Sequence, residues 1–227
     1  MHLNKSNEDY LKQIYLLSDQ TTDIKTSTLS ACLNVSPAAV TDQVKKLAAL
    51  GLVDYQPYKG VILTDLGQTV GRNMVRRHRV LELFLHDVLG LRWDEVHTEA
   101  ERLEHAVSDM LIEKMAETLG NPQFDPHGDP IPSVGGDMPA HQEGVLLSKC
   151  PGGFKGTVVR VLSNDTDFLK CLDAHGVALS RVVELVSRQE FDGAVQVKVN
   201  TRLTTFSQHL ADNILVVPID QAGVSQK

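Results

Sequence analysis

The spacing of apolar residues in the first quarter of the chain predicts three short helices. Apolar side chains recur at helical intervals in residues 7–17, 26–33 and 38–50. Ser36 stands where an N-cap is expected, Pro37 occupies the first helical position, and Gly51 follows the third segment as a stop. The second and third segments, joined by a tight turn, predict a helix-turn-helix.

A hairpin follows at once, because residues 52–63 alternate apolar and polar positions around Lys59-Gly60. A hairpin in this place is the wing of a winged helix, so the segment predicts DNA binding. The candidate DNA contacts are small or polar first and basic further along, which suits base edges and then phosphates. They are Thr28, Ser36, Pro37, Ala38, Ala39, Thr41, Asp42, Gln43, Lys45, Lys46 and Lys59.

Two longer helices are expected next, one from a cap at Thr64 or Asp65 towards Gly90, the other over residues 94–119. The second carries more apolar side chains than one small domain needs, and we interpret the surplus as a dimerisation surface. Prolines and glycines after residue 120 predict a linker. Short apolar runs at 157–162, 181–187, 195–199 and 214–217 predict the strands of a small barrel.

Both long helices carry imidazoles and carboxylates at one-turn intervals. These residues are His78 and Glu82 on the first helix, and His97, Glu101, Glu104 and His105 on the second. In the linker, Asp125-Pro126-His127-Gly128 is a polar segment that could fold back on them. Such a set suits a divalent first-row metal such as Mn(II) or Fe(II). Alternatively, the residues form charge pairs on a solvated helix surface.

The predicted fold class is therefore mainly α with small β parts. We expect a winged helix-turn-helix DNA-binding domain at residues 1–71 and a helical dimerisation and metal-binding domain at residues 72–140. A linker at 141–153 and an SH3-like β-barrel domain at 154–227 complete this organisation.

Charge and composition narrow the classes of function. The net charge of −7 divides into +3 over residues 1–80 and −10 over residues 81–227, so a basic front could bind a polyanion. Three widely spaced cysteines argue against a disulfide framework and a structural zinc site. Without an apolar signal or a membrane-length run, a cytoplasmic protein is expected.

With these features in this order, the chain resembles the three-domain form of the diphtheria-toxin-repressor family of metal-dependent transcriptional regulators. The segments that carry the resemblance are Asn7-Glu8-Asp9-Tyr10-Leu11, Arg77-His78-Arg79, and residues 96–101, 103–105 and 126–132. The resemblance implies a homodimeric repressor that binds double-stranded, pseudo-palindromic operator DNA when loaded with metal. It implies neither a membrane partner nor a small-molecule substrate.

The resemblance also implies the metal ligands: Asp9 joins the residues of the two long helices, and either Asn164 or Asp167 matches a third-domain ligand loosely. His127 of the polar segment is a further candidate ligand. Iron-responsive members have methionine on the first helix and cysteine where Glu101 stands. This chain has Asp9 and Glu101, and a set without sulfur favours Mn(II). We expect one or two Mn(II) ions per subunit and a role in metal-ion homeostasis, with Fe(II) as the alternative.

Two other classes of function are possible. A metallohydrolase would use Glu101, Glu104 and His105, but the chain has no His-Glu-x-x-His motif and no nucleophile beside a histidine, so we expect no enzyme. A winged-helix regulator that senses a non-metal ligand would leave these carboxylates as surface charges.

Overall fold

The computed structural model describes residues 3–19, 21, 23–56, 59–140 and 143–219. The chain divides into two compact units. Unit 1 comprises Met1–Leu81, Ala100–Gln123 and Ile131–Pro139, and unit 2 comprises Glu82–Glu99, Phe124–Pro130 and Ala140–Lys227. Across these described stretches, every helix is too short or too polar to cross a membrane.

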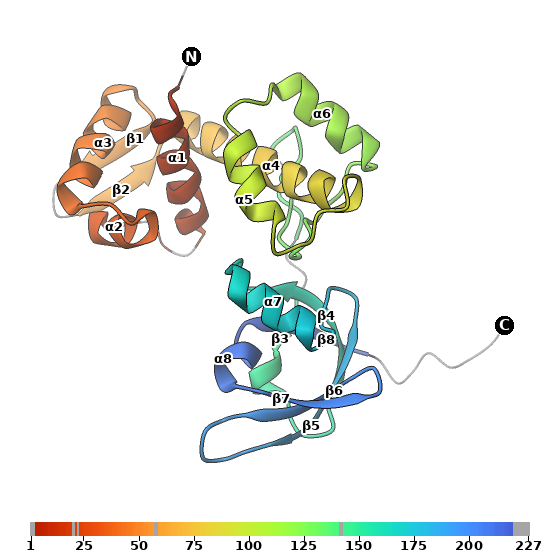
Figure 1. The fold of residues 1–227 in the computed structure, drawn as a ribbon. Helices are drawn as coiled ribbons and strands as arrows, with labels where there is room; N and C mark the ends of the chain where they lie inside the picture. Colours follow the sequence, from red (N-terminus) through yellow and green to blue (C-terminus); the bar gives the residue numbers. More distant parts are fainter. Residues whose placement is uncertain (1–2, 20, 22, 57–58, 141–142, 220–227) are drawn as a thin grey trace. The chain divides into compact units, whose positions relative to one another are not determined.

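Unit 1 begins with three helices and a two-stranded antiparallel hairpin, as the sequence predicts (Figure 1). The elements are α1 Lys5–Ser18, α2 Thr26–Leu33, α3 Pro37–Ala49, β1 Val53–Gln56 and β2 Gly60–Leu63. Ser36 caps α3 by accepting a hydrogen bond from the Ala39 amide at 3.3 Å. Leu11, Leu29 and Leu47 are fully buried in the core that joins the three helices. The hairpin turn, residues 57–58, lies outside the described residues.

A glycine brings helix α4, Asp65–Asp87, against α1. A Cβ on Gly71 would stand 2.7 Å from the Cβ of Tyr15 and 2.8 Å from the carbonyl oxygen of Leu11. These distances are shorter than any normal contact, so only glycine allows this approach. The close packing fixes α1, which carries the candidate ligand Asp9.

The single helix expected over residues 94–119 is wrong, because two helices occupy this stretch. They are α5 Val96–Leu103 and α6 Asp109–Thr118. Helix α5 ends because the amides of Ala106 and Val107 both donate hydrogen bonds to the carbonyl oxygen of Leu103. Helix α6 begins at Ser108, whose side chain accepts a hydrogen bond from the Leu111 amide at 3.3 Å. Glu104 and His105 therefore lie in a turn after α5.

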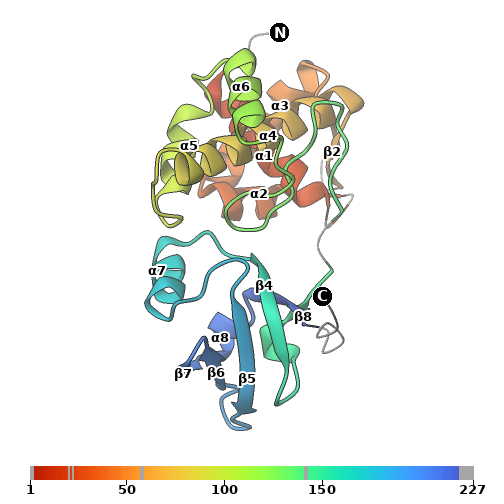
Figure 2. The same ribbon diagram turned by 90° about the vertical axis from the view of Figure 1, so that its right-hand side faces the viewer.

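Unit 2 contains a six-stranded antiparallel sheet in the order β3-β8-β4-β5-β6-β7. The strands are β3 Val145–Leu146, β4 Lys155–Val161, β5 Val182–Arg188, β6 Val195–Val199, β7 Arg202–Phe206 and β8 Ile214–Pro218. The long strands β4 and β5 run side by side in Figures 1 and 2. Four of these strands match the predicted runs. Strand β7 was not predicted from the sequence because its residues are mostly exposed. Strand β3 was also not predicted, and it lies inside the expected linker 141–153. Residues 141–142 of that linker lie outside the described residues.

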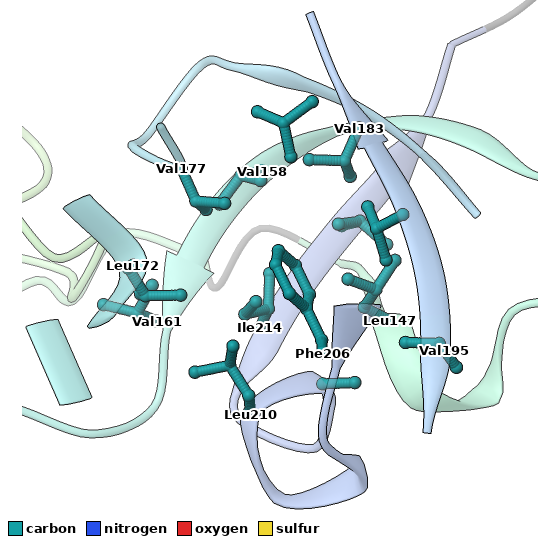
Figure 3. Packing of buried hydrophobic residues seen from close by; sticks show 14 of the residues in the cluster. Leu147, Val158, Val161, Leu172, Val177, Val183, Val195, Phe206, Leu210 and Ile214 are labelled. Atoms are coloured by element: carbon teal, nitrogen blue, oxygen red, sulfur yellow. The ribbon is translucent and has the colours of Figure 1, made fainter. Parts of the chain in front are cut away.

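Three short helices accompany the sheet: η1 Leu147–Lys149, α7 Thr166–Ala174 and α8 Gln208–Ala211. The fully buried ring of Phe206 lies in the core between sheet and helices, close to Ile214 and Leu147 (Figure 3). Alternate residues of β6 point into the same core, and this period of two is why the strand could be predicted. The fold class is confirmed.

We expect Gly71→Ala to destabilise the protein by about 1–3 kcal/mol, because the new methyl group must push α1 and α4 apart. In an ordinary helix the same change stabilises by about 1 kcal/mol. Urea unfolding of the metal-free protein measures the difference. Gly135→Ala is the control, since its Cβ would meet only side-chain oxygens at 3.6 Å and 3.7 Å. A stable Gly71→Ala variant would show that the helix contact is looser than described.

Candidate metal centres

Asp9, Glu104 and His105 form one cluster within unit 1, with a potential ligand atom of each residue within 4.8 Å of the others. His105 Nε2 lies 2.9 Å from Asp9 Oδ1 and 3.4 Å from Glu104 Oε1. Helix α1 supplies Asp9, and the turn after α5 supplies the other two. Glu104 is completely buried.

The imidazole of His105 is oriented by Glu8, whose Oε2 lies 2.7 Å from Nδ1. When Nδ1–H donates to this carboxylate, Nε2 presents a lone pair to Asp9 and Glu104, as in carboxylate–histidine–metal arrangements. Within the described part of the chain, neither Nε2 nor Asp9 Oδ1 has a hydrogen-bond partner. Two such acceptors 2.9 Å apart suit a shared cation. Glu8 was not among the predicted site residues, although it precedes Asp9 directly.

Glu104 is held by two groups besides the cluster. Lys12 Nζ lies 2.6 Å from Glu104 Oε1, and His78 Nδ1 lies 2.5 Å from Glu104 Oε2. Burial opposes ionisation of Glu104, but the hydrogen bond and charge of His78, together with Lys12, outweigh burial and lower its pKa. For Lys12, burial is likewise outweighed by Glu104 and Glu101, which raise the pKa of the ammonium.

The pKa of Asp9 shifts in the opposite direction to that of Glu104. Burial raises the pKa of its carboxyl group above the ordinary value of 3.8, against the lowering effect of His105 and nearby lysines. An ionised Asp9 is therefore incompletely compensated by the protein alone. A divalent cation supplies the missing positive charge, so the residues present fit a metal ion.

Glu82, Asp125 and His127 form a second cluster, within unit 2. Their exposed fractions are 1%, 3% and 0%. His127 Nε2 lies 3.0 Å from the carbonyl oxygen of Trp93, whose ring also stacks on the imidazole. The Nε2–H group donates to this oxygen, and Nδ1 keeps a buried lone pair without a hydrogen-bond partner among the described residues. This orientation of a buried histidine also suits a metal ligand.

The loop that supplies Asp125 and His127 is fixed on strand β4. Asp125 Oδ1 accepts hydrogen bonds from the amides of His127 and Asp129, both at 2.9 Å. Gly128 has a φ of 89°, and a Cβ there would stand 2.2 Å from the carbonyl oxygen of Val159. The sequence analysis named Asp125 in a polar segment but not as a ligand. Its place two residues before His127 was the available signal.

The other predicted ligands, His97, Glu101 and Asp167, are not members of these two clusters. His97 Nδ1 lies 2.9 Å from Glu82 Oε1, beside the second cluster in unit 2. In unit 1, Glu101 Oε1 contacts Lys12 Nζ at 2.6 Å and lies 4.0 Å from His78 Nδ1. Asp167 lies exposed in the first turn of α7 and belongs to neither cluster.

The predicted DNA contacts are exposed on α2, α3 and the hairpin, except for half-buried Thr41 and buried Gln43. The side-chain amide of Gln43 donates to Asn7 Oδ1 on α1. A pocket of about 170 Å³ lies where the start of α2 meets the hairpin. It is lined by Lys25, Thr26, Ser27, Tyr55, Lys59 and Gly60. Two lysines and a helix N-terminus make this pocket suitable for an anion.

Three family models together match most of the chain. "Iron dependent repressor, N-terminal DNA binding domain" matches residues 2–61, "Iron dependent repressor, metal binding and dimerisation domain" residues 64–133, and "FeoA domain" residues 145–218. The iron-dependent repressor IdeR of Mycobacterium tuberculosis is 31% identical over 183 residues, covering 76% of this chain and 80% of the relative. The chain belongs to the iron-dependent, or diphtheria-toxin, repressor family.

Two further proteins are similar to this chain. An uncharacterized HTH-type transcriptional regulator of Methanocaldococcus jannaschii is 40% identical over 114 residues, which is 50% of this chain and 91% of the relative. A solved manganese-dependent transcriptional repressor in complex with manganese has a TM-score of 0.83 and 39% identity, and covers 94% of this chain and 100% of that one. The family resemblance is confirmed, and the protein is a metal-dependent DNA-binding repressor, not an enzyme.

Because burial raises the pKa of Asp9, its ionised form destabilises the metal-free protein at neutral pH. We expect Asp9→Asn to stabilise the metal-free protein at pH 7 by less than about 1 kcal/mol. The gain should shrink as the pH falls through the raised pKa of folded Asp9 and should vanish below 3.8, where Asp9 is protonated in both the folded and the unfolded state. Urea unfolding in chelator at several pH values measures this. A loss of stability at pH 7 would contradict the assigned environment of Asp9.

Proposed function

We propose that this protein is a Mn(II)-dependent repressor that binds operator DNA as a homodimer and controls metal-ion homeostasis. The cluster of Asp9, Glu104 and His105 carries the proposal. Its potential ligand atoms are carboxylate oxygens and an imidazole nitrogen, and such a set without sulfur suits Mn(II). The structurally similar manganese-dependent repressor supports this choice. Fe(II) is the alternative, supported by the similar iron-dependent repressor.

Asp9, Glu104 and His105 would hold the ion, which would supply two positive charges to these carboxylates. Helix α1 connects this centre to the DNA-binding helix α3. Asp9 lies on α1, two residues after Asn7, whose side chain accepts the hydrogen bond from Gln43 of α3. A conformation in which Asp9 joins Glu104 and His105 therefore also fixes α3. The ion favours this conformation by its higher affinity for it, which links metal binding to DNA binding.

The second cluster supports a further ion in each subunit. Glu82, Asp125 and His127 are buried and their loop is fixed on β4, so the ligands are ready before metal arrives. The contact of His97 Nδ1 with Glu82 Oε1 at 2.9 Å supports His97 as a further ligand of this ion. Asp167 stays a proposed ligand from the family resemblance alone. We therefore expect two ions per subunit, one at each cluster.

The proposed DNA contacts and dimer follow from exposed surfaces of unit 1. The small and polar residues at the start of α3 are available for base edges, and the pocket between Lys25 and Lys59 for a phosphate. On α6, Met110 and Leu111 are 75% and 44% exposed. Apolar side chains of this size suit a dimer interface within residues 72–120. A two-fold dimer reads a pseudo-palindromic operator.

The test of the metal response is Asp9→Ala. We expect the variant to fold and dimerise but to lose about 100-fold or more in operator affinity with Mn(II), because a bound ion can no longer link α1 to the turn after α5. Operator affinity is measured at matched free Mn(II), Fe(II) and Zn(II), and Glu190→Ala, which removes an exposed carboxylate between β5 and β6, is the control. Metal-dependent binding by Asp9→Ala equal to that of the parent would refute the proposed centre. Tighter operator binding with Fe(II) than with Mn(II) would favour the alternative.

For the DNA interface, Lys25→Ala and Lys59→Ala should each weaken binding to every DNA sequence by a similar factor. Each should also reduce the slope of log affinity against log salt by about one unit, because each removes one phosphate contact. Titrations of operator and unrelated DNA at several salt concentrations measure both effects. Lys155→Ala, in the C-terminal sheet, is the control. Unchanged slopes in both pocket variants would place the phosphate elsewhere.

A further inference from the structure

The exposed face of helix α3 carries one carboxylate among small and basic side chains. Asp42 lies one turn after Ala38 and one turn before Lys46, and all three are exposed. Val40 and Leu47 are buried on the opposite face of the same helix. In a helix-turn-helix, the early residues of the second helix contact base edges in the major groove. Asp42 therefore lies at the centre of the surface available to bases.

The other polar side chains within residues 37–43 already have partners in the protein. The hydroxyl of Thr41 donates a hydrogen bond to the carbonyl oxygen of Pro37 at 2.9 Å. The side-chain amide of Gln43 is buried and donates to Asn7 Oδ1. In the part of the chain that the structure describes, the carboxylate of Asp42 takes part in neither a hydrogen bond nor an ion pair. Its oxygens are available to a ligand of this surface.

The stability of helix α3 does not explain an aspartate at this position. Asp42 lies beyond the first turn of α3, where the helix dipole no longer stabilises a carboxylate appreciably. Aspartate is also a weak helix former in the interior of a helix. On a surface that faces DNA, its charge is repelled by the phosphates. A favourable contact with the bases would offset these costs.

The chemistry of a carboxylate restricts the bases that it can contact. An ionised carboxylate only accepts hydrogen bonds. In the major groove, the amino groups of cytosine and adenine are donors, whereas guanine N7 and O6 and thymine O4 are acceptors that repel a carboxylate. The amino group of adenine lies beside the acceptor N7, but cytosine presents no acceptor there. Cytosine is therefore the base that a carboxylate fits best.

We propose that Asp42 determines sequence specificity by accepting a hydrogen bond from the amino group of a cytosine in each operator half-site. The inference rests on the proposed function and deepens it, because it names a base and the residue that selects it. The ammonium groups of Lys45 and Lys46, exposed one turn further along α3, offset the repulsion between Asp42 and the phosphates. The same carboxylate excludes guanine from this position.

The test selects duplexes from a pool of randomised DNA with the full-length protein in Mn(II), and sequencing gives the preferred base at each position. The parent should prefer cytosine at one position of each half-site, and guanine there should lower affinity about tenfold or more. Asp42→Ala should bind all four bases at this position alike and keep the other preferences. Asp42→Asn should prefer adenine instead, because an amide pairs with both N6 and N7.

Lys46→Ala is the matched control on the same face of α3. It should weaken binding to every sequence and leave each base preference unchanged, as the loss of a phosphate contact does. Asp42→Ala should have the opposite effect on unrelated DNA and bind it more tightly, because a repulsive charge is removed. An aspartate with only a structural role in α3 would change neither base preference nor the affinity for unrelated DNA.

The outcomes separate this inference from the proposed function. A parent that selects no sequence with either Mn(II) or Fe(II) would overturn both. If the parent selects a sequence but Asp42→Ala keeps the same preference at every position, only the role of Asp42 is wrong. A selected half-site without a cytosine that depends on Asp42 would likewise overturn this inference alone.

Discussion

Neutralising the buried carboxylate of Glu104 is the constraint on which the organisation of unit 1 depends. The side chain has no exposed surface, so each of its oxygens needs a partner from the protein. Lys12 comes from α1 and His78 from α4, while Arg77 donates to the backbone oxygen of Glu104 at 2.9 Å. Since three elements meet at one residue, the turn after α5 is held in one position. The same contacts bring Asp9 and His105 together.

Helix α1 contacts both the candidate metal centre and the DNA-binding helix α3. These contacts explain how a change of charge at the centre affects the DNA-binding surface. Its Glu8, Asp9 and Lys12 contact the centre, whereas Asn7 binds Gln43 of α3. Gly71 lets α4 pack closely against Leu11 and Tyr15 of the same helix. Because α1 contacts all these elements, a small movement of Asp9 also moves α3 through the hydrogen bond between Asn7 and Gln43.

Local signals made much of the fold predictable. The bounds of α2 and the cap of α3 follow from Ser36, Pro37 and the apolar spacing nearby. The break between α5 and α6 was missed because the apolar spacing continues across it, and only the Ser108 cap marks it. At the site, residue types and one-turn spacings singled out Glu82, Glu104 and His105, whereas Asp9 came from the family resemblance. The partners of Lys12, however, lie 89 and 92 positions away, and tertiary packing alone pairs them. The position of Asp125 in the second cluster likewise depends on how its loop packs against β4, which the sequence does not indicate.

The chemistry of the two clusters has a consequence for oxidative stress. Their potential ligand atoms are oxygen and nitrogen, and the three free cysteines Cys32, Cys150 and Cys171 belong to neither. Peroxides convert thiolates and thioethers to oxidised forms that no longer bind metal in the same way, but carboxylates have no comparable reaction. A sensor built from these groups keeps its ligands when the thiol balance of its surroundings changes. Oxidants then affect such a sensor by changing the concentration and oxidation state of the metal instead of by oxidising its ligands.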